Sequence, residues 1–222
     1  MGFLRCALAE WPFLRIRLLR TRLWVWLVLL LTVVLRLDRA AMAHDPLAAA
    51  LLVASGSATL CVAYLAGARA DRLALGPALL HPRSPGAITV GRWLAAWCGA
   101  AIAVLAATLH SGFGVAFASL VTAATMSAWT LALAWCGGNV LVGGWLVWLA
   151  LMGEQTPEAV LAHPVPGPLR IAIAAALEVL PGVWRYRGLA SAAPGATAHA
   201  GLWILAGLVL ARSRAARSCG SR

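Results

Sequence analysis

Long apolar runs, rather than an alternation of hydrophobic and polar positions, organise most of this chain. Each run is bounded by arginine, proline or glycine-rich stretches. A helix needs roughly 20 apolar residues to cross the ~30 Å hydrocarbon core of a bilayer. Backbone groups in lipid must be hydrogen-bonded internally, and these runs lack the alternation of a β-barrel. We therefore expect every run to be a transmembrane helix.

Six such helices are predicted, and we number them as spans one to six in chain order. Their expected bounds are 23–37, 46–68, 93–109, 113–135, 140–152 and 198–211. The fifth span follows the turn Gly137-Gly138-Asn139. The chain is thus predicted to be an all-α integral membrane protein with one transmembrane domain over residues 1–222.

Residues 1–22 mix apolar and basic positions too closely for a span. The apolar positions are interrupted by five arginines (Arg5, Arg15, Arg17, Arg20 and Arg22). This mixture is typical of an amphipathic helix that lies in the membrane interface, with guanidinium groups among the phosphates. Residues 33–36 offer no small-residue cleavage site, so we expect this helix to belong to the mature protein.

The segment 153–199, between the fifth and sixth spans, begins polar and rich in proline. Its apolar piece, 171–180, carries Glu178 and ends before Pro181 and Gly182. About ten helical residues rise about 15 Å, which is half a bilayer. We therefore expect short re-entrant or interfacial helices on the outer face rather than a seventh span.

Composition excludes a soluble domain. Charged residues make up 11% of the chain and hydrophobic residues 62%, whereas soluble domains average about 25% charged residues. The net charge of +11 comes from 18 basic residues, all arginine, against 7 acidic ones. Such a total can indicate nucleic-acid binding, but these arginines stand between apolar runs, where they orient spans. No nucleic-acid partner is expected.

The distribution of arginine predicts the orientation. Arginines are concentrated in residues 1–22, in the segment 69–92 between spans two and three, and after residue 211. With six spans these three groups fall on one side of the membrane and outnumber the arginines of the other side. Because basic loops stay in the cytoplasm, both termini are expected there.

Residues that could carry out chemistry are scarce. No predicted span interior holds paired carboxylates, and without lysine the chain cannot form a P-loop. The five cysteines show no C-x-x-C spacing. We expect no catalytic residue, no metal site and no cofactor bound by this chain.

Four polar or aromatic positions leave alternatives open. Glu178 is either an outer gate or substrate contact, or a carboxylate solvated at the interface. His110 stands beside Ser111, but adjacent residues cannot face each other as a nucleophile pair, so an interfacial loop histidine is expected. Trp145 and Trp148 are expected to anchor the outer interface, with stacking on a flat ligand as the alternative.

The segment 69–92 is longer than a connection between two spans requires. It carries an apolar cluster (Leu73, Leu75, Leu79 and Leu80) among arginines, with prolines behind it. This pattern predicts a short helix parallel to the membrane that exposes a leucine ridge to the cytoplasm. Such a helix suits docking of a partner protein; the alternative is a tether that only lies on lipid.

Here the chain resembles a known family. The stretch Leu79-Leu80-His81-Pro82, followed by Gly91-Arg92-Trp93, is similar to the Leu-x-x-Pro and Gly-Arg/Lys pattern of the six-span permease subunits of ABC transporters in the type-2 exporter class. Those subunits have a basic N-terminal helix, a cytoplasmic coupling helix between spans two and three, and short outer helices between spans five and six. One departure is that Asp71 and Arg72 stand where the family often has glutamate, which would weaken coupling.

The resemblance implies a permease of a bacterial inner membrane with a cytoplasmic ATP-binding cassette subunit as its partner. ATP and Mg would bind to that subunit, and a second permease chain, identical or different, would complete the transporter. The residues that would contact the ATPase or anchor the coupling helix are Arg72, Leu75, Leu79, Leu80, Pro82, Arg83 and Arg92. A non-transporting membrane scaffold or assembly factor is the leading alternative, and an intramembrane enzyme is the third.

Overall fold

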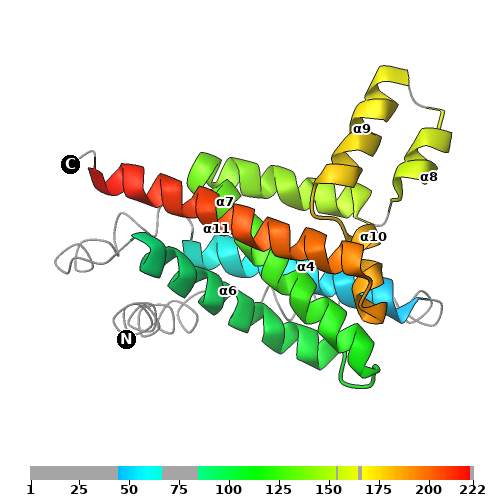
Figure 1. Ribbon diagram of the computed structural model, residues 1–222, viewed down its shortest axis with the longest axis horizontal. Helices are drawn as coiled ribbons and strands as arrows, with labels where there is room; N and C mark the ends of the chain where they lie inside the picture. Colours follow the sequence, from blue (N-terminus) through cyan, green and yellow to red (C-terminus); the bar gives the residue numbers. More distant parts are fainter. Residues whose placement is uncertain (1–44, 67–84, 154, 165–166, 221–222) are drawn as a thin grey trace.

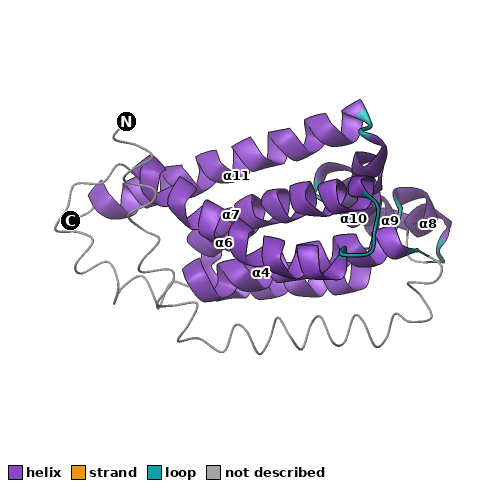
Figure 2. Ribbon diagram, turned by 90° about the horizontal axis from the view of Figure 1, so that it is seen from below, coloured by secondary structure: helices purple, strands orange, loops and turns teal. Residues whose placement is uncertain are grey.

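The computed structural model describes residues 45–66, 85–153, 155–164 and 167–220. Helices make up nearly all of these residues (Figure 2). The predicted interfacial helix 1–22 and the first predicted span lie outside the described residues. Spans two to six can therefore be compared with the structure.

Four long helices run side by side as a bundle (Figures 1 and 2). They are α4 (Pro46–Ala66), α6 (Pro85–Ala107), α7 (Phe113–Met152) and α11 (Pro194–Gly220). The longest, α7, is broken at Gly138, whose φ of 62° and ψ of −149° are not helical. A positive φ favours glycine because it has no Cβ. In Figure 1 the second arm of α7 turns back from this break along the first arm.

The structure has apolar helices at the places of the predicted spans two to six, and it corrects the start of one of them. Helix α4 matches span two and the first arm of α7 matches span four, with the break at the predicted glycine turn. The second arm, Val140–Met152, has the bounds of span five but is shorter than the roughly 20 residues that a full crossing needs, so the fifth span stays a prediction. The predicted start of span three at residue 93 is wrong, because α6 begins at Pro85. Proline suits the first turn of a helix. Arg92, at which the sequence predicts the membrane boundary, lies inside the bundle.

Short helices occupy the segment between the second arm of α7 and α11, as predicted. They are α8 (Pro157–Ala162), α9 (Gly167–Val179), α10 (Val183–Tyr186) and the 3-10 helix η1 (Arg187–Ser191). Figure 1 shows α8 and α9 projecting from one end of the bundle. Helices α8 and α9 share a small core of Val160, Ala174 and Leu177.

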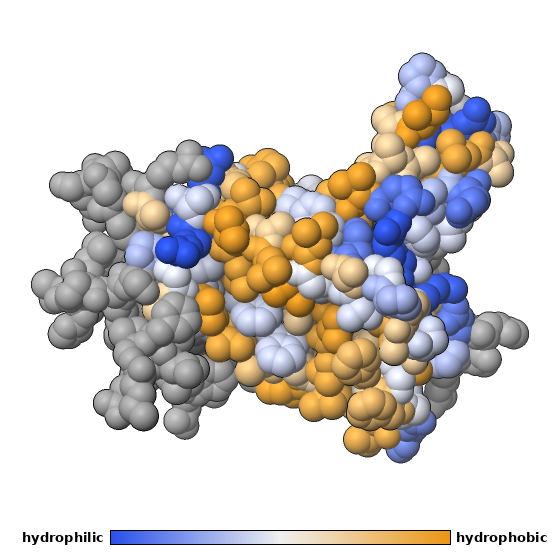
Figure 3. All heavy atoms as spheres, viewed as in Figure 1, coloured by the Kyte–Doolittle hydropathy of each residue, from blue (hydrophilic) through white to orange (hydrophobic). Residues whose placement is uncertain are grey.

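Within the described residues, five helical stretches are long and apolar enough to cross a membrane. They are Pro46–Tyr64, Pro85–Ala107, Phe113–Gly138, Gly167–Ser191 and Pro194–Ala216. Hydrophobic side chains also cover the middle of the face seen in Figure 3. These features are those of a multi-pass membrane protein. The stretch Gly167–Ser191 is interrupted between α9 and α10, and α9 itself has 13 residues, which rise about 20 Å.

Small side chains bring the bundle helices close together. Ala54 and Ala58 of α4 and Ala95 of α6 are fully buried. Gly99 of α6 faces α4, and a Cβ built there would lie 3.1 Å from the Cys61 Sγ. Close approach of this kind is how transmembrane helices associate without a hydrophobic driving force.

Hydroxyl side chains buried in the bundle mostly bond to the backbone of their own helix. Ser55 donates to the Leu51 carbonyl and Thr59 to the Ser55 carbonyl, each at 2.8 Å. The Thr59 hydroxyl also lies 3.4 Å from that of Thr130 on α7. Bonding to the carbonyl four residues earlier satisfies these hydroxyls where no water is at hand.

Candidate functional site

The predicted ATPase-contact residues lie almost entirely outside the described part of the chain. Those in the segment 67–84 are Arg72, Leu75, Leu79, Leu80, Pro82 and Arg83. Their role therefore stays a prediction. Arg92 is the member of the set that the structure describes.

Arg92 lies inside α6, seven residues after its first residue, and is 5% exposed. Its guanidinium carbon lies 5.1 Å from the ring centre of Trp135, which is near the end of the first arm of α7. A cation over an indole face is attracted by the ring's electrons, and more strongly where water is excluded. Arg92 thus links the start of α6 to α7, and it faces the bundle instead of the surface.

Glu178, the predicted outer gate, stands near the C-terminal end of α9 and forms an ion pair with Arg185 of α10. The two side chains are 47% and 27% exposed. The Arg185 guanidinium also lies over the Trp184 ring, 5.0 Å from its centre. A pair this exposed contributes little to folding, about 1 kcal/mol at most. It connects α9 to α10 across the break at Pro181.

Side chains of α10 and α11 bind the carbonyl groups at the C-terminal end of α9. Trp184 donates its indole N–H to the Leu177 carbonyl at 3.1 Å. Trp203 donates to the Val179 carbonyl at 2.9 Å, and the His199 Nε2 lies 3.2 Å from the same oxygen. The last carbonyls of a helix have no partner within it, so these contacts replace the missing ones.

We call Glu178, Arg185, Tyr186, His199 and Trp203 the α9–α11 cluster. Within it the Tyr186 and His199 rings lie 5.8 Å apart. Tyr186 is fully buried, and its hydroxyl has no hydrogen bond of good geometry. The cluster thus joins an exposed ion pair to an unsatisfied hydroxyl in the interior, where the short helices meet the bundle. Figure 3 shows hydrophilic residues gathered where α9 meets the bundle.

A row of tryptophans continues from this cluster into the bundle. Trp203 packs edge to face against Trp129 with ring centres 4.8 Å apart, and Trp129 does the same against Trp145 at 6.0 Å. Trp145 is 5% exposed, so the prediction that it anchors the membrane interface is wrong for this residue. Its ring contacts Trp129 across the two arms of α7, and its indole N–H has no acceptor.

Other sequence candidates are not brought together. His110 and Ser111 lie at the turn between α6 and α7, and His110 is exposed, as expected for a loop histidine. Cys61 is buried, whereas Cys98 and Cys136 are exposed. Among the described residues, no group of three or more His, Cys, Asp or Glu side chains could hold a metal ion.

Two pairings in this region were missed from the sequence. Arg187 of η1 pairs with Asp45, just before α4, at 2.9 Å, and Arg185 pairs with Glu178. The spacing of seven between Glu178 and Arg185 does not place the two residues on one helix face, because Pro181 and Gly182 end the helix between them. The spacing of four between His199 and Trp203 was a usable signal, since it places both on one helix face.

Comparison with known proteins identifies no relative: no family model, no curated protein and no solved structure matches this chain.

The contacts described above can hold α9 at a fixed place against α10 and α11, and they join α6 to α7 through Arg92. The structure places the Glu178–Arg185 ion pair at one end of the bundle and the start of α6 at the other.

Proposed function

We propose that this chain is the membrane-spanning permease subunit of an ABC transporter, an exporter driven by a separate ATP-binding subunit. The observation that carries the proposal is the position of the short helices. Helices α8, α9, α10 and η1 stand between the second arm of α7 and α11, where the resembled permeases have short outer helices between spans five and six. The apolar helices before them lie in the order expected for spans two to five, the last of them being the short second arm of α7.

The proposed coupling path starts at the segment 69–92. The ATPase would dock on its leucine ridge, and closure of the ATPase on nucleotide would move that segment. Because α6 begins at Pro85, the second part of the segment is continuous with a membrane helix of 23 residues. Arg92 over Trp135 would pass the movement from α6 into α7. Two permease chains would enclose the substrate path between them.

At the other end of the bundle, the Glu178–Arg185 ion pair would act as the outer gate of that path. Both side chains are partly solvated, so opening the pair costs little. Such a contact is suited to repeated opening and closing, since neither charge becomes buried and unpaired.

The proposal predicts that Leu79→Asp with Leu80→Asp abolishes binding of the ATPase. Two carboxylates on the ridge would remove its apolar contact while leaving the spans unchanged. The measurement is affinity purification from native membranes in mild detergent, with every copurifying chain identified. The matched control is Leu161→Asp on α8, which makes the same change at a leucine that is 46% exposed.

We expect the wild type and the control to bring down a P-loop ATPase in stoichiometric amount, and the double variant to insert normally without it. If the double variant retains the ATPase, the docking site is misplaced. If the folded wild type reproducibly purifies without any ATP-binding chain, the transporter proposal is wrong and a membrane scaffold becomes the better account.

A further inference from the structure

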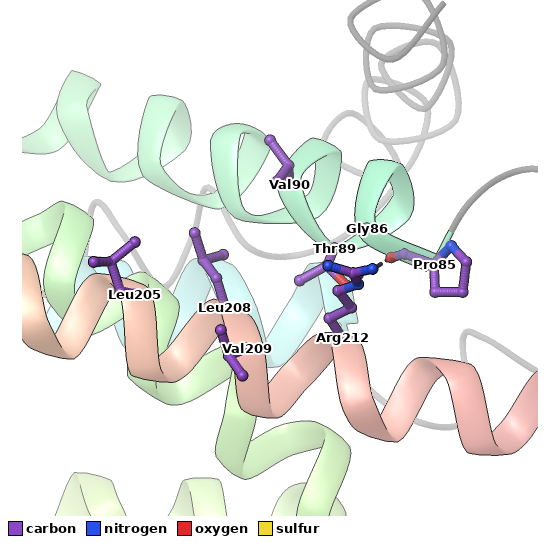
Figure 4. A pocket seen from close by; sticks show the side chains of 8 residues that line it. All are labelled: Pro85, Gly86, Thr89, Val90, Leu205, Leu208, Val209 and Arg212. Atoms are coloured by element: carbon purple, nitrogen blue, oxygen red, sulfur yellow. Dashed lines mark hydrogen bonds between the residues drawn. The ribbon is translucent and has the colours of Figure 1, made fainter.

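A groove runs between the start of α6 and the later part of α11 (Figure 4). Its volume is about 380 Å³, which is within the usual range of ligand pockets, roughly 300–1,000 Å³. The lining side chains include Thr89 and Val90 of α6 and Leu205, Leu208, Val209 and Arg212 of α11. The groove is therefore apolar along most of its length and basic at one end.

The apolar part of the groove opens on the side of the bundle that would face lipid. Leu205 is 65% exposed and Val209 is 64% exposed. The polar side chain in the wall, Thr89, donates its hydroxyl to the Pro85 carbonyl of its own helix at 2.9 Å. The walls thus suit a hydrocarbon chain, because a polar occupant would leave its own groups unpaired there.

Arg212 ends the groove with an exposed guanidinium (Figure 4). Within the described part of the chain no carboxylate forms an ion pair with it. The described acidic residues, Asp45, Glu158 and Glu178, all belong to the opposite end of the bundle or to the short helices there. The first turn of α6 lines the same end of the groove, so the positive end of its dipole adds to the charge of Arg212.

We propose that this groove binds one anionic phospholipid, with an acyl chain along Val90, Leu205 and Val209 and the phosphate on Arg212. Charge complementarity carries the choice of occupant, since the apolar groove ends at an exposed arginine that no carboxylate of the described residues pairs with. Basic pockets between transmembrane helices bind anionic lipid headgroups in this way. The site needs a membrane around the protein but no transport activity, so it is independent of the function proposed above.

The test is native mass spectrometry of the purified full-length protein with phosphatidylglycerol or phosphatidylcholine added in mild detergent. The variant Arg212→Gln removes the charge, and Arg170→Gln, at a half-buried arginine of α9 far from the groove, is its control. The variant Val209→Trp fills the groove. Its control is Val140→Trp, at a residue of α7 that is 83% exposed and outside the groove.

We expect one phosphatidylglycerol per chain, bound more tightly than phosphatidylcholine. Arg212→Gln should weaken phosphatidylglycerol binding about fivefold, the factor for one arginine near a lipid surface. Val209→Trp should abolish it, and both controls should bind as the wild type does. Unchanged melting temperatures would show that the variants are folded.

Three results would overturn the proposal. One is equal binding of the two lipids, which would mean that the arginine selects no anionic headgroup. Another is wild-type binding of phosphatidylglycerol by Val209→Trp, which would place the lipid elsewhere. The third is a dimer that Val209→Trp converts to monomer, because the groove would then be covered by a second copy of the chain.

Discussion

At Gly207 the backbones of α11 and α7 approach more closely than any side chain would permit. A Cβ at this residue would lie 2.6 Å from the Ala128 carbonyl oxygen and 3.0 Å from the Trp129 nitrogen. These are backbone atoms, so they cannot move aside as a flexible side chain could. The glycine thus sets the spacing at which Trp203 reaches Trp129.

We therefore predict that Gly207→Ala destabilises the bundle. Overpacking of a close contact costs about 1–3 kcal/mol, or about 5 °C in melting temperature for a chain of this size. The control is Gly201→Ala in the same helix, where a Cβ would meet nothing within 4 Å. Alanine is favoured over glycine in a helix by about 1 kcal/mol, so the control should melt slightly higher than the wild type. Equal melting temperatures for the two variants, measured in detergent, would contradict the close contact.

The positions of two residues, Arg92 and Trp145, could not be predicted from the sequence. An arginine next to an apolar run predicts the edge of a membrane helix, so the sequence alone places Arg92 in the docking segment. Its position over Trp135 depends on two helices meeting, and nothing in the local sequence encodes that meeting. Trp145 was missed as a core residue for the same reason, because its partner Trp129 lies on the other arm of α7.

At the scale of elements, α9 depends on side chains outside it for its C-terminal end. The indole N–H groups of Trp184 and Trp203 hold the Leu177 and Val179 carbonyls. Each such hydrogen bond contributes about 1 kcal/mol net. Without them the final turn of α9 would have to find water or unwind.

The double variant Trp184→Phe with Trp203→Phe should accordingly loosen α9 while keeping the aromatic packing. We expect backbone hydrogen exchange across 167–180 to become at least about tenfold faster, from the loss of roughly 2 kcal/mol. Trp145→Phe is the matched control, because it removes an indole N–H that has no acceptor. Unchanged exchange in the double variant would mean that the two indole N–H groups do not hold the end of α9.

Elements with a strong local signal were predictable, and those defined by tertiary contacts were not. The break in α7 followed from a glycine pair in an apolar run, and the end of α9 followed from Pro181-Gly182. The start of α6 did not follow, since eight residues with few large apolar side chains resemble a loop until they pack. The groove between α6 and α11 was equally hidden, because it joins residues more than a hundred positions apart.

At the scale of the whole molecule, charge is distributed unequally between the two ends of the bundle. The end of α11 carries Arg212 and Arg214, and within the described residues no acidic side chain lies there. The other end and its short helices hold three acidic residues (Asp45, Glu158 and Glu178) and three arginines (Arg170, Arg185 and Arg187). The charges of these described residues therefore cancel. The positive-inside rule then predicts that α11 ends in the cytoplasm.

Fusions of alkaline phosphatase, which is active only outside the cytoplasm, would test this orientation at four positions. We expect activity after residues 111 and 163, and none after 138 and 216, because one crossing separates the members of each neighbouring pair. These crossings are the first arm of α7, its second arm and α11. The alternative is that Gly167–Ser191, which is apolar enough to span, also crosses the membrane. Activity after both 163 and 216 would then be observed, and the arginines at the end of α11 would lie outside. The break between α9 and α10 and the balanced charge around it argue for the first result, since a crossing there would put an ion pair and two arginines into or beside the hydrocarbon core.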